Sequence, residues 1–193
     1  EAEIIRDLNL AAAGLLSNKV GGISVFPPMP AGIANLSYAN SFKWNASKGT
    51  DRYRRGLYTF FKRTSPHPNL LTFDCPDSNV ACVKRNRSNT PLAALVTLNN
   101  VTYVESAKAF AQRILKEAPP KDEERIAHGF RLCVARSPAP KETEAFANLL
   151  ADSRSWYEKH PEDAKAFGGD SETAAWSATV RIMLNMDEFI TRE

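Results

Sequence analysis

Residues 101–120 read VTYVESAKAFAQRILKEAPP. Apolar residues recur in this stretch every three or four positions, as they do on one face of an α-helix: Val101, Val104, Ala107, Phe110, Ala111, Ile114 and Leu115. Pro119 and Pro120 end the pattern, because proline has no N–H to donate and its ring clashes with the preceding turn. The stretch predicts a long amphipathic helix, and similar patterns on both sides of it make the fold class mainly α.

Helices are predicted through the whole second half of the chain. Pro91 suits the first turn of a helix that Asn89 or Thr90 caps and that Asn99-Asn100 breaks. After Pro120 we expect helices over Asp122–Ala135, from Ser137 onward past Tyr157, and over Glu172–Ile190, with a flexible connector EDAKAFGGD at 162–170. The last of these helices is apolar around most of its circumference, so it should be packed on two sides.

The first half is predicted to be more irregular. Residues 1–16, EAEIIRDLNLAAAGLL, have helical spacing, and this helix should end near Ser17. An extended, irregular segment follows over Asn18–Gly49, because Gly21-Gly22 and Pro27-Pro28-Met29-Pro30 do not allow a helix. The alternation of Phe42 and Trp44 with polar residues indicates a short strand there.

The segment after Thr50 favours a helix with Tyr53, Leu57, Phe60 and Phe61 on one face. Ser65-Pro66-His67-Pro68 would terminate it. A β-hairpin over residues 42–63 is the open alternative, because aromatic residues also suit strands. Residues 69–90 read as a second irregular stretch with turns.

Together these patterns predict a single domain over residues 1–193, with an irregular, basic half at about 1–90 and a helical half at about 91–193. The chain opens with Glu1 instead of Met, so we expect a fragment of a larger polypeptide. No apolar run approaches the roughly 18 residues of a membrane-spanning helix. Cys75 and Cys82 could form a disulfide, which the sequence leaves open, and no Cys/His spacing predicts a haem or zinc site.

Positive charge is concentrated in residues 43–90, where ten Lys or Arg face three Asp, a net charge of +7. Such an excess can attract an anionic ligand, since guanidinium groups suit carboxylate, sulfate and phosphate. The candidate binding residues are Arg54, Arg55, Lys62, Arg63, Arg85 and Arg87. The interpretation that we rank first is structural, because arginines interleaved with aromatics tend to bond backbone carbonyls inside a fold. No recognised nucleic-acid-binding motif accompanies the charge.

A second candidate is a polar site at His67, Asp74 and Asp77. A histidine can act as a base near neutral pH, and two carboxylates on one turn can hold an oxygen-preferring cation. The ordinary alternative is that His67 caps a helix and that both aspartates form turns. The sequence predicts no catalytic residue, metal or cofactor beyond this alternative.

The words RRGLYTFFKRTSPHP at 54–68 and LLTFDCPDSNVACVKRNRSNTPLAALVTLN at 70–99 resemble the planctomycete-specific domain of unknown function found C-terminal to planctomycete cytochrome C modules. The resemblance implies a location outside the cytoplasm, in a large protein with haem-binding or carbohydrate-binding neighbours, and it implies no activity. We therefore expect a non-catalytic structural or interaction domain that could also bind an anionic polysaccharide. The alternative is a hydrolase-like or metal-assisted enzyme that uses His67 and nearby carboxylates.

Overall fold

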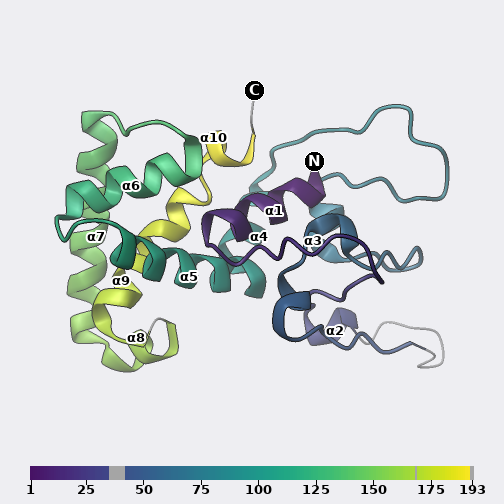
Figure 1. Cartoon of the computed structure of the whole chain (residues 1–193), viewed down its shortest axis with the longest axis horizontal. Coiled ribbons are helices and arrows are strands. Elements are labelled where there is room, and N and C mark those ends of the chain that lie inside the picture. Colours follow the sequence, from purple (N-terminus) through teal and green to yellow (C-terminus); the bar gives the residue numbers. More distant parts are fainter. Residues whose placement is uncertain (35–41, 168, 192–193) are drawn as a thin grey trace.

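Helices α5, Val101–Glu117, and α9, Ser171–Met183, lie at the centre of the helical half of the protein (Figure 1). The computed structural model describes residues 1–34, 42–167 and 169–191. Helix α9 packs between α5 and α7, Pro140–Lys159, while α6, Asp122–Val134, contacts α5, α7 and α9. The described part of the chain is mainly α-helical and forms no sheet, which confirms the predicted fold class.

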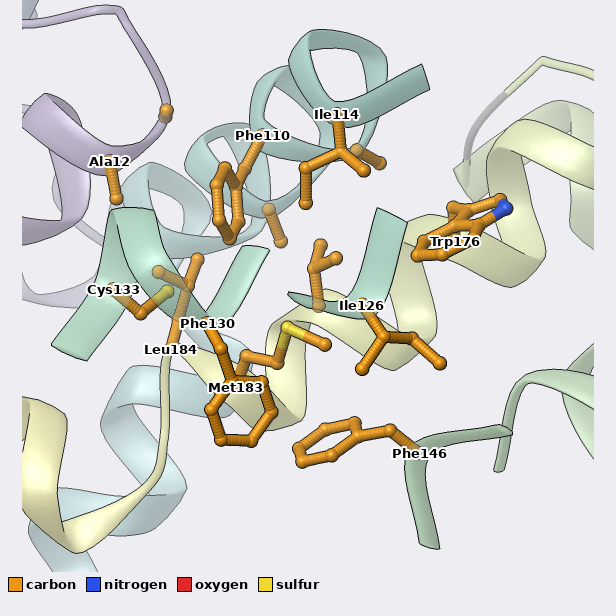
Figure 2. Packing of buried hydrophobic residues seen from close by; sticks show 14 of the residues in the cluster. Ala12, Phe110, Ile114, Ile126, Phe130, Cys133, Phe146, Trp176, Met183 and Leu184 are labelled. Atoms are coloured by element: carbon orange, nitrogen blue, oxygen red, sulfur yellow. The ribbon is translucent and has the colours of Figure 1, made fainter. Parts of the chain in front are cut away.

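The core of this half is a set of side chains from α5, α6 and α9. Phe110, Ile114, Phe130, Trp176 and Met183 are all 0% exposed. Figure 2 shows Phe130 and Met183 close together, with Phe146 of α7 completing that side of the cluster. Because α9 contributes buried residues toward both α5 and α7, the prediction that it is packed on two sides is confirmed.

The boundaries of α4, Pro91–Asn99, follow the predicted capping. Thr90 Oγ1 accepts the backbone N–H of Ala93 at 3.1 Å, and Pro91 occupies the first turn. Asn100 ends α4 and caps α5, where its Oδ1 accepts the N–H of Thr102 at 3.0 Å. These caps satisfy backbone donors that the first turn of a helix leaves unpaired.

Helix α1 is shorter than predicted, since it spans Ala2–Ala12 and not residues up to Ser17. Gly14 has φ +72°, a conformation that glycine adopts without steric cost and that ends a helix. The N–H groups of Leu15 and Leu16 then both bond the carbonyl of Leu10, at 2.9 and 3.1 Å. Helix α1 lies on α5, so it joins the two halves of the protein.

The predicted helix after Thr50, with Tyr53, Leu57, Phe60 and Phe61 on one face, is wrong. This segment has two short 3-10 turns, η2 at Gly49–Tyr53 and η3 at Gly56–Tyr58, and is extended elsewhere. The backbone of this segment forms hydrogen bonds with the first loop instead of the internal hydrogen bonds of a helix. Ser17 N–H donates to Tyr53 O at 3.0 Å, and Val25 N–H donates to Tyr58 O at 2.8 Å. Long-range pairing therefore replaces the local helix.

The alternative hairpin over 42–63 and the strand at Phe42–Trp44 are also absent from the described residues. Two isolated parallel bridges occur instead, Ser17 with Arg54 and Val25 with Thr59. Trp44 donates its Nε1–H to Pro27 O at 2.7 Å, so its side chain is fixed by the preceding loop. The same loop contains the short helix α2, Ala31–Ala34. A second loop begins after helix α3, Pro68–Thr72.

Two boundaries near the end of the chain differ from the prediction. Residues 162–167 of the expected connector belong to α8, Pro161–Phe167, which begins at a proline and packs the ring of Phe167 on Tyr157. The expected helix over 172–190 is split into α9 and α10, Asp187–Ile190. Asn185 lies in the break and accepts a hydrogen bond from Thr97 of α4, so its side chain is held by another helix.

Candidate functional site

Arg54 is the most deeply buried of the predicted binding residues, with 1% of its surface exposed. Its guanidinium donates to the carbonyls of Ile23 at 3.0 Å, Lys19 at 3.2 Å and Gly21 at 2.5 Å. The same group lies 3.7 Å above the centre of the Tyr58 ring. Arg54 thus fastens the first loop to the η2–η3 segment through three backbone carbonyls of that loop.

Two arginines beside it extend this arrangement to the helices. Arg6 of α1 donates to the carbonyls of Arg54 at 3.2 Å and Arg52 at 2.6 Å. Burial lowers the pKa of the Arg6 guanidinium, because the charged form is poorly solvated there. Arg52 in turn bonds Glu105 of α5, with Nε to Oε2 at 3.1 Å. The segment is therefore held from α1 and α5 at once.

Carboxylates of α1 pair with two further candidates. Asp7 accepts the Nε of Arg55 at 2.9 Å and the backbone N–H of Gly56 at 2.6 Å. Glu3 accepts Arg85 at 2.8 Å. These pairs place two positive charges of the basic segment beside carboxylates of α1 at the surface, where the side chains of Arg55 and Arg85 are 47% and 37% exposed.

The remaining three candidates differ from one another. Lys62 lies with its Nζ 5.1 Å above the Phe42 ring. Arg63 and Arg87 are exposed, and Arg87 stands at the edge of a cleft beside α1. The six residues are thus not gathered into one patch, and their role in binding a ligand stays a prediction.

His67 is 2% exposed and caps α3. Its Nδ1 accepts the N–H of Asn69 at 3.3 Å, so its Nε2 carries the proton and donates to Pro28 O at 3.1 Å. Burial, with the positive charge of Arg6 nearby, lowers the pKa of His67 to about 4. His67 is therefore neutral at physiological pH, with both ring nitrogens engaged.

Asp74 and Asp77 lie in the loop after α3. Asp74 has φ +58° and accepts both the N–H and the hydroxyl of Ser88, at 2.6 and 2.7 Å. Asp77 accepts the N–H of Asn79 at 3.0 Å, a bond that lowers the pKa of its carboxyl. Within the described residues no group of three or more His, Cys, Asp or Glu side chains could hold a metal ion.

His67 and Asp74 line different cavities. His67 lines a cavity of about 10 Å³ together with Arg6 and Tyr103. Glu3 lines this cavity too, but its carboxylate is paired with Arg85. A role of His67 in catalysis stays a prediction.

A larger cleft lies between α1, the end of α3, the segment before α4 and α10. It has a volume of about 320 Å³, and its lining residues are Glu1, Ile4, Ile5, Leu8, Phe73, Asp74, Asn86, Arg87, Ser88, Ile190 and Thr191. The helical spacing of residues 1–16 predicts one apolar face that includes Ile4 and Leu8, and it does not reveal the cleft. The signal available was the width of that apolar face, which exceeds what one neighbouring helix covers.

The model of the PSD1 family, described as a protein of unknown function (DUF1553), matches residues 1–150. The chain belongs to the PSD1 family. The match confirms the resemblance seen at 54–99 at the level of a domain of unknown function. No curated protein and no solved structure matches the chain.

The PSD1 match contains the whole arginine arrangement, His67 and most of the cleft, while Ile190 and Thr191 lie beyond it. In this PSD1 chain Cys75 and Cys82 form no disulfide with each other, a question that the sequence left open. No helix of the described ranges has both the length and the hydropathy to span a bilayer.

Proposed function

We propose that this PSD1 domain is a non-catalytic structural and interaction domain of a larger protein outside the cytoplasm. The observation that carries the proposal is the use of Arg54: its guanidinium is buried on three backbone carbonyls and a tyrosine ring. Arg6, Arg52 and Arg55 are also bonded within the fold. Part of the positive charge of residues 43–90, on Arg52, Arg54, Arg55 and Arg85, thus holds irregular chain to helices or to other loops.

Helix α4 supplies a surface for the interaction. Residues 88–104 contain no charged side chain, and Leu92 and Leu95 of α4 are 60% and 57% exposed. Residues three apart lie on one face of a helix, so the two leucines form a continuous apolar strip. Exposed apolar strips are typical of protein interaction sites. We assign this strip to a neighbouring module of the same polypeptide, for which the resemblance of 54–99 implies a haem-binding or carbohydrate-binding module of a planctomycete protein.

Hydrogen exchange tests this assignment. The domain would be compared alone and joined to its neighbouring module, and amides of α4 should exchange more slowly in the joined protein. Leu95→Glu should remove that protection. Val83→Glu, at a fully exposed position in the loop before α4, should leave it unchanged. Equal exchange of α4 in the two proteins would contradict the interaction role.

Binding of an anionic polysaccharide is the second candidate function. It is favoured by the exposure of Arg63 and Lys84, whose charged side chains project from loops. The test is retention on a sulfated polysaccharide column. Arg63→Gln and Lys84→Gln should each lower the salt concentration that elutes the domain, and elution at an unchanged salt concentration would contradict this function.

A further inference from the structure

The cleft beside α1 has a wall that is fastened at three points. Arg85 pairs with Glu3 of α1 at 2.8 Å, and Ser88 donates to Asp74 at 2.6 and 2.7 Å. Asn89 donates to Asp187 of α10. Residues 85–89 are therefore held against three separate elements, and the cleft that they border is a built feature of the fold.

The floor of this cleft is apolar. Ile4 is 39% exposed, and Ile5, Leu8, Phe73 and Ile190 continue the same lining. Apolar surface gains free energy when a ligand removes it from water. A volume of about 320 Å³ lies at the lower end of the range of small-molecule pockets, which runs from roughly 300 to 1,000 Å³.

Arg87 supplies the positive charge at the mouth. Among the described residues its guanidinium has no hydrogen-bond, ion-pair or ring partner. The acidic groups of the cleft are engaged: Asp74 with Ser88, and Glu1 at 3.8 Å from Arg85. The lining thus contains two carboxylates that have partners and one side-chain cation, Arg87, that has none in the described part of the chain; a guanidinium binds carboxylate through paired hydrogen bonds.

We propose that this cleft binds a small monocarboxylate with an apolar body, in the manner of a medium-chain fatty acid. The carboxylate bonds Arg87, and the hydrocarbon lies on Ile4, Leu8 and Ile190. Arg87 is one of the candidate anion-binding residues of the basic segment. In the structure it lies beside the apolar lining of the cleft, which a polysaccharide would not contact. The site is independent of the interaction role of α4.

Titration of the whole domain with octanoate, decanoate and octan-1-ol tests the proposal, with the methyl NMR signals of isoleucine and leucine as the readout. Decanoate should bind roughly fifteenfold more tightly than octanoate, since each of its two additional methylenes contributes about fourfold when buried. Octanoate should shift the methyl signals of Ile4, Leu8 and Ile190, which places the ligand in the cleft.

Substitution at the mouth separates the two parts of the ligand. Arg87→Gln should weaken octanoate about tenfold and leave octan-1-ol unchanged, because only the charged head contacts the guanidinium. Arg63→Gln removes another exposed arginine outside the cleft and should change neither affinity. Ile4→Asp should weaken both ligands.

Three results would overturn the proposal: no saturable binding of decanoate, methyl shifts that avoid Ile4, Leu8 and Ile190, or equal octanoate affinity of the Arg87→Gln variant and the unsubstituted domain. The folded state of each variant is checked in the same spectra. A variant that loses octanoate binding but shows unchanged amide hydrogen exchange at α4 would show that this site is distinct from the proposed interaction surface.

Discussion

Asp7 of α1 accepts the backbone N–H of Gly56 at 2.6 Å, although the two residues are 49 positions apart. The second carboxylate oxygen of Asp7 accepts Arg55 at 2.9 Å, and the Asp7 side chain is only 11% exposed. One carboxylate thus fixes the path of the η2–η3 segment over α1. This contact explains why a stretch with helical spacing lies extended.

Replacing Asp7 by alanine should destabilise the protein by about 3 kcal/mol, because a buried N–H and a guanidinium each lose a charged acceptor. Asp7→Asn keeps an acceptor for Gly56 and should cost about 1 kcal/mol. Urea unfolding measures both. The control is Asp51→Asn, which removes an exposed ion pair with Lys19 and should change stability by less than about 0.5 kcal/mol. Similar losses at Asp7 and Asp51 would contradict the structural role of Asp7.

Gly56 itself permits the close approach to α1. A β-carbon at this position would lie 2.4 Å from the backbone oxygen of Glu3, and backbone of a helix cannot move aside cheaply. Gly56→Ala should therefore lower stability by about 2 kcal/mol or more. Gly32→Ala is the matched control, since nothing lies within 4 Å of its β-carbon. A thermal melt in which both variants unfold at the same temperature would count against the packing of this segment on α1.

Arg54→Met should unfasten the first loop, because three carbonyls lose a buried donor while the hydrocarbon volume is kept. The expected loss is about 3 kcal/mol, with faster amide exchange at residues 19–25. Arg63→Met, at an exposed arginine, should stay within about 0.5 kcal/mol. Unchanged exchange at 19–25 in the Arg54 variant would show that the loop is held by other contacts.

Helices α4 to α7 could be predicted from the sequence because their signals are local. Apolar spacing gives the face, and Pro91, Asn100 and Pro140 mark boundaries that depend only on nearby backbone geometry. The same spacing between Tyr53 and Phe61 led to a wrong prediction of a helix. Carbonyl groups at 19–23 and the carboxylate of Asp7 accept hydrogen bonds from that segment and hold it in another conformation. Those partners are distant in sequence, so no local pattern reveals them.

The inward use of the arginines could be expected from their place among aromatic residues, and the coordination of Arg54 follows that expectation. The cleft could not be predicted, because its lining comes from residues 1–8, 73–74, 86–88 and 190–191. Contacts between residues distant in sequence bring these segments together: Arg85 with α1, Ser88 with Asp74, Asn89 with α10, and the apolar packing of Ile5, Phe73 and Ile190. Tertiary ties of this kind leave no periodic trace in the sequence.

His67 should make stability depend on pH between about 6.5 and 4. Its pKa in the folded protein is lowered to about 4 by burial, whereas an unfolded histidine titrates near 6.5. Above pH 6.5 the His67 side chain is neutral in the folded and in the unfolded protein. As the pH falls below 6.5, this side chain binds a proton in the unfolded protein but not in the folded one, so stability is lost. The loss ends below pH 4, where His67 is protonated in both states. The expected loss is about 3 kcal/mol, at roughly 1.4 kcal/mol per pH unit.

Urea unfolding across this window measures the slope, and His67→Asn gives the comparison, because asparagine can still cap α3 without titrating. The variant should be less stable at pH 7 but show a flatter profile, and equal slopes in the two proteins would rule out His67 as the titrating group.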